Sequence, residues 1–187
     1  MFEDSGIKYE NQYVDRETWP TEKKRLLETG DNPFGQLPVV EHNGKTLFQS
    51  TSIFRYYAKK LNLHGSNDEE EYLVDNLHDC IMDSLKDASV LFGSDEAAKT
   101  LYWSEKAIPN VEKVEKVAST NGRNPGPYFL GPLFSWVDIL IFQFVHIQKS
   151  GIPDFSTRFP FLTKVASNVA ARPNIASYLS SDSFLGK

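Results

Sequence analysis

Residues 33–56 decide the fold of this protein, and they read PFGQLPVVEHNGKTLFQSTSIFRY. Two β-prone runs, Leu37–Glu41 and Thr46–Phe48, flank Asn43–Gly44, a pair that supplies the positive φ angles of a tight hairpin turn. Ser50 then offers an N-cap, after which apolar residues recur at helical spacing. The stretch therefore predicts a β-hairpin that leads directly into a helix.

Upstream of this stretch the signals are weaker. Ile7, Tyr9, Asn11 and Tyr13 recur at period two, which predicts a short strand with little apolar character. A polar loop is expected to follow through about Lys24.

Downstream, the chain reads as one helix after another. A linker at residues 65–68 precedes a long helix over residues 68–92, whose first turn is acidic, as the helix dipole favours. A further helix is expected over residues 96–118, broken or kinked near Pro109 because proline lacks an amide proton and clashes with the preceding turn. The later part of the chain is therefore predicted to be all-helical.

Ser135 and Asp138 have the spacing of a capping box, in which each side chain bonds the other residue's backbone amide. The apolar run Ile139–Phe142 follows, so this box should start the most buried helix. Two more helices are expected, one around Phe161–Val169 and one starting at Pro173, a residue suited to the first helical position.

Composition narrows the classes of function. The chain has 187 residues, 40% of them hydrophobic, which is enough for one domain or for a small domain joined to a helical one. Its net charge of -5, without a long basic run, disfavours nucleic acid as a partner. No stretch approaches the roughly 20 apolar residues of a membrane helix, and the acidic start is unlike a signal peptide. We expect a cytoplasmic protein.

The metal-binding and redox residue types are sparse. Cys80 has no second cysteine to pair with, and its place on the apolar stripe of the long helix predicts a buried structural thiol. The histidines, at positions 42, 64, 78 and 146, are far apart and none pairs with another ligand type at metal spacing. We expect no metal site.

The runs PFGQLPVV (33–40) and GKTLFQSTSIFRY (44–56) together resemble the glutathione-binding segment of glutathione transferases. Their spacing is most similar to the sigma class, which includes prostaglandin D synthases, with the alpha class a near neighbour. Trp19–Pro20, the capping box and Arg172–Ile175 also fall where that family has counterparts, so the resemblance covers almost the whole chain.

The resemblance implies an α+β thioredoxin-like domain over residues 1–64 and an all-α domain over residues 68–187. It implies an enzyme that conjugates reduced glutathione to hydrophobic electrophiles, with glutathione as co-substrate, no other cofactor, and a homodimer as the working form. A prostaglandin-isomerase activity of the sigma type is a further alternative.

The resemblance also implies how glutathione is bound. Leu37–Pro38 matches the family's cis-proline turn, which frees the Leu37 backbone to pair with the cysteinyl unit of glutathione. Gln49 and Ser50 match the residues that hold the γ-glutamyl carboxylate at a helix N-terminus. Without this context, the last two residues would simply be a helix cap.

Four other residues match positions that contact glutathione: Trp19 and Lys23 at the glycyl end, Gln36 lining the same groove, and Asp83 reaching the γ-glutamyl ammonium across a dimer. Each has a plainer interpretation as well, since an indole often packs in a core and charged side chains usually cover helix surfaces. For Phe92, Tyr102 and Trp103 two interpretations stay open, the lining of an electrophile pocket and packing in the core or in an interface.

By the same alignment, residues 2–9 correspond to the end of the family's first helix and the entry to its second strand. The first strand, and the tyrosine that stabilises the glutathione thiolate, then have no counterpart, so no catalytic residue is assigned. Tyr9 and Tyr13 are expected on a peripheral strand, away from the hairpin. The alternative function is therefore a catalytically inactive binding or structural protein on the transferase scaffold.

Overall fold

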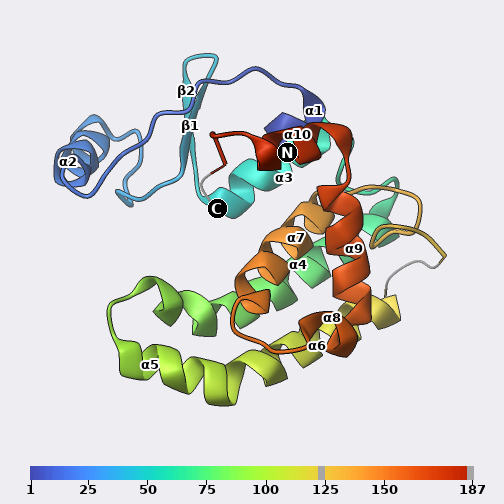
Figure 1. Ribbon diagram of the computed structural model, residues 1–187. Helices are drawn as coiled ribbons and strands as arrows, with labels where there is room; N and C mark the ends of the chain where they lie inside the picture. Colours follow the sequence, from blue (N-terminus) through green and yellow to red (C-terminus); the bar gives the residue numbers. More distant parts are fainter. Residues whose placement is uncertain (122–124, 185–187) are drawn as a thin grey trace.

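The computed structural model describes residues 1–121 and 125–184 (Figure 1). The predicted hairpin is present: β1 (Val39–His42) pairs antiparallel with β2 (Lys45–Phe48), with His42 opposite Lys45 next to the turn. Asn43 and Gly44 both have positive φ, 50° and 71°. The turn therefore forms as the sequence predicts, because these residue types tolerate left-handed backbone. Within the described residues, these two strands make up the whole sheet.

Three helices accompany the hairpin: α1 (Phe2–Ser5), α2 (Trp19–Thr29) and α3 (Ser50–Lys60). The predicted start of α3 is confirmed to within one residue, with Gln49 in the N-cap position and Ser50 as the first helical residue. The hairpin thus runs straight into α3, as its sequence indicates.

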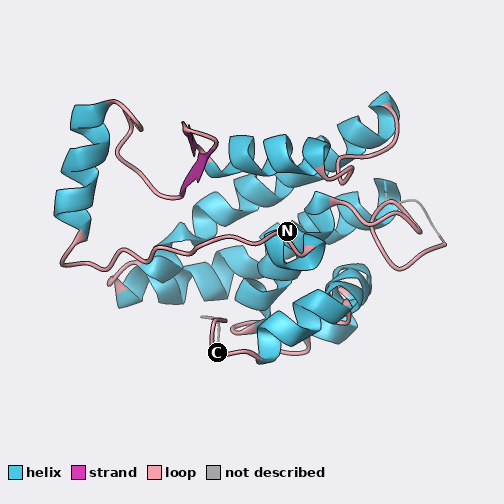
Figure 2. Cartoon of the chain, turned by 90° about the horizontal axis from the view of Figure 1, so that it is seen from above, coloured by secondary structure: helices cyan, strands magenta, loops and turns pink. Residues whose placement is uncertain are grey.

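Two predictions for the first 30 residues are wrong. Residues 7–15 form no strand, because a strand needs a ladder partner and neither strand of the hairpin pairs with them. The loop expected through Lys24 ends earlier, since α2 begins at Trp19. Pro20 suits the first turn of a helix, and residues 22–28 are good helix formers. In Figure 2 a long loop joins α1 to α2.

The rest of the chain is helical, as expected. The elements are α4 (Asp68–Ala88) with a 3₁₀ turn η1 (Ser89–Phe92), α5 (Glu96–Leu101), a π-helical turn η2 (Tyr102–Lys106), α6 (Ala107–Asn121), α7 (Trp136–Lys149), α8 (Phe155–Arg158), α9 (Pro160–Ala170) and α10 (Pro173–Ser180). The predicted break near Pro109 lies at η2, just before the proline, because the missing amide removes one regular helical bond. No helix among the described residues is long and apolar enough to cross a membrane.

Helix α7 lies at the centre of the helical part and packs against α4 and α9 (Figure 1). Ile141 and Phe144 are fully buried on it, and the buried Gln148 accepts a hydrogen bond from the Tyr102 hydroxyl at 2.8 Å. Tyr102 is therefore a core residue, whereas Phe92 is 75% exposed. Cys80 is half-buried rather than buried, because it sits at the border of the apolar stripe of α4.

The predicted capping box starts α7. The Asp138 carboxylate is fully buried and accepts from the backbone N–H of Ser135 (2.7 Å), the Ser135 hydroxyl (2.8 Å) and the backbone N–H of Phe129 (2.8 Å). Burial outweighs these bonds and raises the pKa of Asp138 to about 6. One carboxylate thus fixes both the start of α7 and the loop before it.

Replacing Asp138 by Asn should lower the free energy of unfolding by about 1 to 3 kcal/mol, because the amide group cannot accept from all three donors and leaves buried N–H groups unpaired. Chemical denaturation at neutral pH measures the change. Asp68→Asn, in the exposed first turn of α4, is the matched control and should have a much smaller effect.

The pH dependence tests the same group. Because the folded-state pKa of Asp138 is raised, the pH-linked part of its contribution to stability is full at acidic pH, below the unfolded value, and is lost as the pH rises through about 6, whereas the part due to its hydrogen bonds remains. The stability difference between the native chain and Asp138→Asn should therefore shrink between about pH 4 and pH 7. A difference that is constant over this range contradicts the prediction.

The two ends of the described chain are joined by Arg172. Its guanidinium donates to both carboxylate oxygens of Asp4, at 2.6 and 2.8 Å, and to the Tyr128 hydroxyl at 3.0 Å. It also lies 3.7 Å from the centre of the Phe134 ring. The Asp4 side chain is only 7% exposed, so the contact is shielded from water. Arg172 therefore holds α1 against α10.

Arg172→Lys should destabilise the fold by about 1 to 2 kcal/mol, since lysine cannot reproduce the two-pronged contact with Asp4 while it also covers an aromatic ring. Thermal unfolding measures the loss. Arg158→Lys, at a more exposed 3.6 Å ion pair with Glu112, is the control, and an equal effect of the two substitutions would refute the special role of Arg172.

Candidate functional site

A pocket of about 320 Å³ opens where the hairpin, α1 and α3 meet. One side comes from the hairpin and α3: Pro38, Val40, Ser50, Ile53, Phe54 and Tyr57. The other side comes from the start of the chain and α10: Met1, Phe2, Glu3, Tyr9 and Tyr178. The pocket is thus mostly apolar, with a hydroxyl, a carboxylate and phenols at defined points.

Ser50 brings the N-terminus of α3 to this pocket. Gln49, immediately before it, has a φ of 67° and makes no side-chain cap bond, so the first amides of α3 lack an internal partner. Free amides at the positive end of an eleven-residue helix favour an anionic group. Gln49 is exposed and Ser50 half-buried, so both are accessible from outside.

The Leu37–Pro38 peptide bond is cis, as the resemblance implies, and it precedes β1 directly. Leu37 is 49% exposed. Of the eight residues predicted to contact glutathione, the structure brings Pro38 and Ser50 together in the pocket, with Leu37 and Gln49 next to them in sequence. Two of the eight predicted residues therefore lie in the wall of one pocket of this chain.

Asn32 positions this loop and was missed by sequence reasoning. It is 1% exposed, its side-chain amide donates to the backbone oxygen of Gln36 at 2.6 Å, and its side-chain oxygen accepts from the N–H of Phe34 at 3.0 Å. An asparagine directly before a proline is a turn signal that could have indicated this role.

Four of the predicted residues lie outside the lining of the pocket, namely Trp19, Lys23, Gln36 and Asp83. The Lys23 side chain lies 3.1 Å from where a Cβ on Gly35 would be, so α2 packs closely on the loop that carries Gln36. Trp19 is half-buried at the start of α2. Asp83 is exposed on α4, where its carboxylate pairs with Lys86.

Tyr9 lies nearer the hairpin than expected. In place of a peripheral strand, the structure puts Tyr9 on the wall of the pocket that contains Pro38 and Ser50. Its hydroxyl donates to Glu3 Oε1 at 2.7 Å, and this bond to a carboxylate raises the pKa of Tyr9 well above its ordinary value. The Tyr9 phenol therefore keeps its proton at neutral pH and donates it in a hydrogen bond to the Glu3 carboxylate.

A cluster of aromatic rings and histidines supports the pocket from below. Phe54 stacks on Trp136 with ring centres 6.0 Å apart, and His78 lies 5.0 Å from the same indole. His78 also contacts the Thr51 hydroxyl at 3.2 Å. On the surface, Arg55 donates to Asp75 at 2.9 Å. These contacts fix α3 to α4 and α7, and so hold the pocket in place.

Comparison with known proteins agrees with this architecture. Residues 2–59 match the glutathione S-transferase N-terminal domain, and residues 82–182 match the glutathione S-transferase C-terminal domain. Glutathione S-transferase 1 of Ascaris suum is 32% identical over 187 residues, covering 96% of this chain and 86% of the relative. Human glutathione S-transferase P is 27% identical over 99% of this chain and 86% of its own length.

Solved structures give the same result. NaGST-2 superposes with a TM-score of 0.85 at 26% identity, over 100% of this chain and 90% of its own. A prostaglandin synthase D of Nilaparvata lugens superposes with a TM-score of 0.79 at 28% identity, over 97% of this chain and 88% of its own. This chain therefore belongs to the glutathione transferase family, as the two domain matches, the relatives and the combination of a small hairpin domain with a helical part show.

Proposed function

We propose that this protein is a glutathione transferase that conjugates reduced glutathione to hydrophobic electrophiles. The observation that carries the proposal is the open N-terminus of α3 beside the cis Leu37–Pro38 turn, in a chain of this family. The γ-glutamyl carboxylate binds at Gln49 and Ser50, where free amides and the helix dipole favour negative charge. The Leu37 backbone then pairs with the cysteinyl unit of the peptide.

The other end of glutathione extends toward α2. Lys23 offers an ammonium to the glycyl carboxylate and Trp19 an indole N–H, with Gln36 between them and the turn. The close packing of Lys23 on Gly35 supports this arrangement. Asp83 is exposed on α4 and outside the lining of the pocket, so it is assigned to the partner's glutathione in a homodimer. The unit that binds glutathione comprises residues 1–64 and the helical unit residues 68–187.

The reaction is attack of the glutathione thiolate on the electrophile, with the thiol proton passed to solvent or a base. A sigma-like class and a prostaglandin-isomerase specialisation are supported by the spacing of residues 33–56 and by the prostaglandin synthase relative. The relative named glutathione S-transferase P supports a pi-like class equally.

One observation favours a second candidate function, a glutathione-binding protein without transferase activity. Tyr9 is the phenol that reaches the pocket from the start of the chain, and its proton is already held by Glu3. A phenol so engaged is a poor donor to a thiolate. Both candidate functions require that the protein binds glutathione, but only the transferase turns over an electrophilic substrate.

Titration calorimetry with reduced glutathione, combined with turnover of a chromogenic aryl halide, separates these candidates. Binding with turnover supports the transferase, and binding without turnover supports the second candidate. Absence of both, in a folded sample, overturns the proposed function.

Ser50→Ala should weaken glutathione binding by about tenfold, because it removes a hydrogen bond to a charged carboxylate without altering the core. Calorimetry measures the dissociation constant. Ser52→Ala, exposed on the same helix and away from the pocket lining, is the matched control and should bind like the native chain. Equal affinities for Ser50→Ala and the native chain would remove Ser50 from the site.

A further inference from the structure

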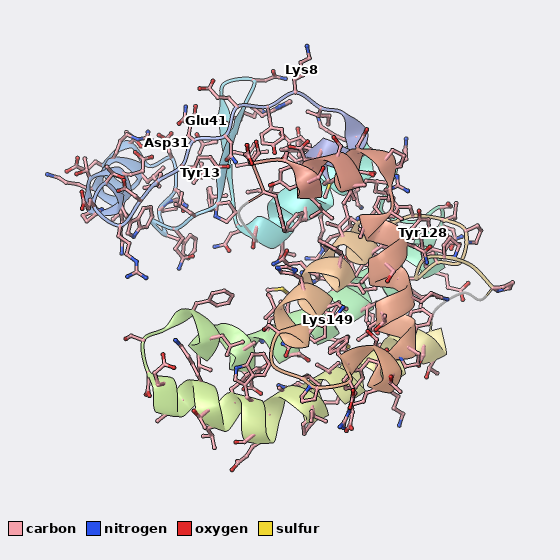
Figure 3. The ribbon with its side chains drawn as sticks, viewed as in Figure 1. Lys8, Tyr13, Asp31, Glu41, Tyr128 and Lys149 are labelled. Atoms are coloured by element: carbon pink, nitrogen blue, oxygen red, sulfur yellow. The ribbon has the colours of Figure 1, made fainter. Side chains whose placement is uncertain are left out.

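The turn of the hairpin consists of an asparagine followed by a glycine, and both residues, Asn43 and Gly44, are exposed. Glu41, labelled in Figure 3, lies on β1 two residues before the turn. In an asparagine–glycine pair the glycine nitrogen can attack the asparagine side chain, because glycine has no side chain to shield that nitrogen. A second such pair, Asn121–Gly122, extends outside the described residues.

The backbone nitrogen of Gly44 is available as a nucleophile. The ladder ends with the pair of His42 and Lys45, so Gly44 lies outside it, and among the described residues the Gly44 N–H has no acceptor. A Cβ on Gly44 would meet no atom within 4 Å, so the space around this residue is open. The described residues therefore leave room for the rotation that brings the Gly44 nitrogen to the side chain of Asn43.

The amide nitrogen of the Asn43 side chain lies beside an imidazole. Asn43 Nδ2 is 3.2 Å from His42 Nε2, and the His42 ring packs edge-on against Tyr57 with ring centres 5.8 Å apart. An amide nitrogen that leaves as ammonia has to take up a proton, and a protonated imidazole within hydrogen-bond reach can supply it. His42 is thus placed to act as the acid when the Asn43 side chain loses its nitrogen.

Asn62 provides an internal comparison. It is exposed, as Asn43 is, and its φ is also positive, 55° against 50°. The residue after it is Leu63, whose backbone N–H donates to the Ala58 oxygen at 2.8 Å. Exposure and φ are therefore matched at the two asparagines, whereas the following nitrogen is free at Gly44 and engaged at Leu63.

We propose that Asn43–Gly44 is a site of spontaneous covalent modification, with His42 as the proton donor. The Gly44 nitrogen loses its proton to water and bonds to Asn43 Cγ, the Cγ–Nδ2 bond breaks, and Nδ2 takes a proton from His42 and leaves as ammonia. Water then opens the resulting cyclic imide at either of its carbonyl carbons. One opening gives aspartate, and the other gives isoaspartate, in which the main chain runs through the former side chain.

The two products affect the hairpin differently. Isoaspartate adds a carbon to the main chain inside a two-residue turn, and the length of such a turn sets the register of the strands that it joins. That register pairs Val40 with Leu47 and His42 with Lys45. Isoaspartate therefore weakens the ladder next to the turn. Aspartate preserves the ladder, because an aspartate–glycine pair suits this turn as well as asparagine–glycine does.

Ageing of the full chain in neutral buffer tests the proposal. Tandem mass spectrometry follows the conversion of each asparagine over time, and enzymatic methylation of isoaspartate distinguishes the two products. Asn43 should convert at least about tenfold faster than Asn62, because the following nitrogen is free and a proton donor is at hand. Conversion of Asn43 no faster than that of Asn62 overturns the proposal.

His42→Gln tests the proton donor. Glutamine keeps a polar side chain next to the amide but cannot pass on a proton, so conversion of Asn43 should slow about tenfold. This effect is smaller than the roughly hundredfold or more of a general acid in an enzyme, because water competes with His42 at an exposed turn. An unchanged rate in His42→Gln overturns the assignment of His42.

Asn43→Gly is the matched control for the effect on the hairpin. It has no side chain to cyclise, and a glycine pair also suits the turn. Ageing should reduce the hydrogen-exchange protection of the Lys45 amide in the native chain and leave it unchanged in Asn43→Gly. Isoaspartate formation without loss of this protection contradicts the proposed weakening of the ladder.

Circular dichroism checks that both variants fold. If His42→Gln does not, the comparison of Asn43 with Asn62 in the native chain still decides whether the turn is a modification site. Since no glutathione is present in these experiments, their results are independent of the glutathione titration.

Discussion

The N-terminus of α7 is the point on which the rest of the structure depends. The buried Asp138 carboxylate joins the start of this helix to the loop at Phe129, and the backbone N–H of Trp136 donates to the Leu63 oxygen at 2.9 Å. The indole of Trp136 in turn stacks against the ring of Phe54 in α3. A single helix start therefore ties the helical core to the element that opens the candidate site.

This arrangement explains how a small sheet can be held in place beside the candidate site. A two-stranded hairpin is marginally stable on its own, so its place must come from packing. Helix α3 follows the hairpin directly and is held by Trp136 and His78 from the helical part. The N-terminal end of α3 is thus fixed by contacts made far from the hairpin in sequence.

Among the described residues, β1 is paired with a strand along one of its two edges only. Each unpaired backbone group costs about 1 to 3 kcal/mol when buried, a large fraction of the 5 to 15 kcal/mol by which domains are stable. The structure limits this cost because β1 borders a groove rather than a packed interior.

Local chemistry was enough to predict the hairpin, α3 and the capping box of α7, because Asn43–Gly44 and the Ser135 to Asp138 spacing favour one geometry whatever surrounds them. The order of residues 33–56 likewise determined the Pro38 and Ser50 pairing in one pocket. Residues 7–15 show the limit of such reasoning, since alternation predicts a strand only where a neighbour can pair with it. Tertiary structure alone decided where Tyr9 lies, that its hydroxyl donates to Glu3, and that a groove runs beside β1. These features depend on which segments lie side by side and not on the residues of any one segment.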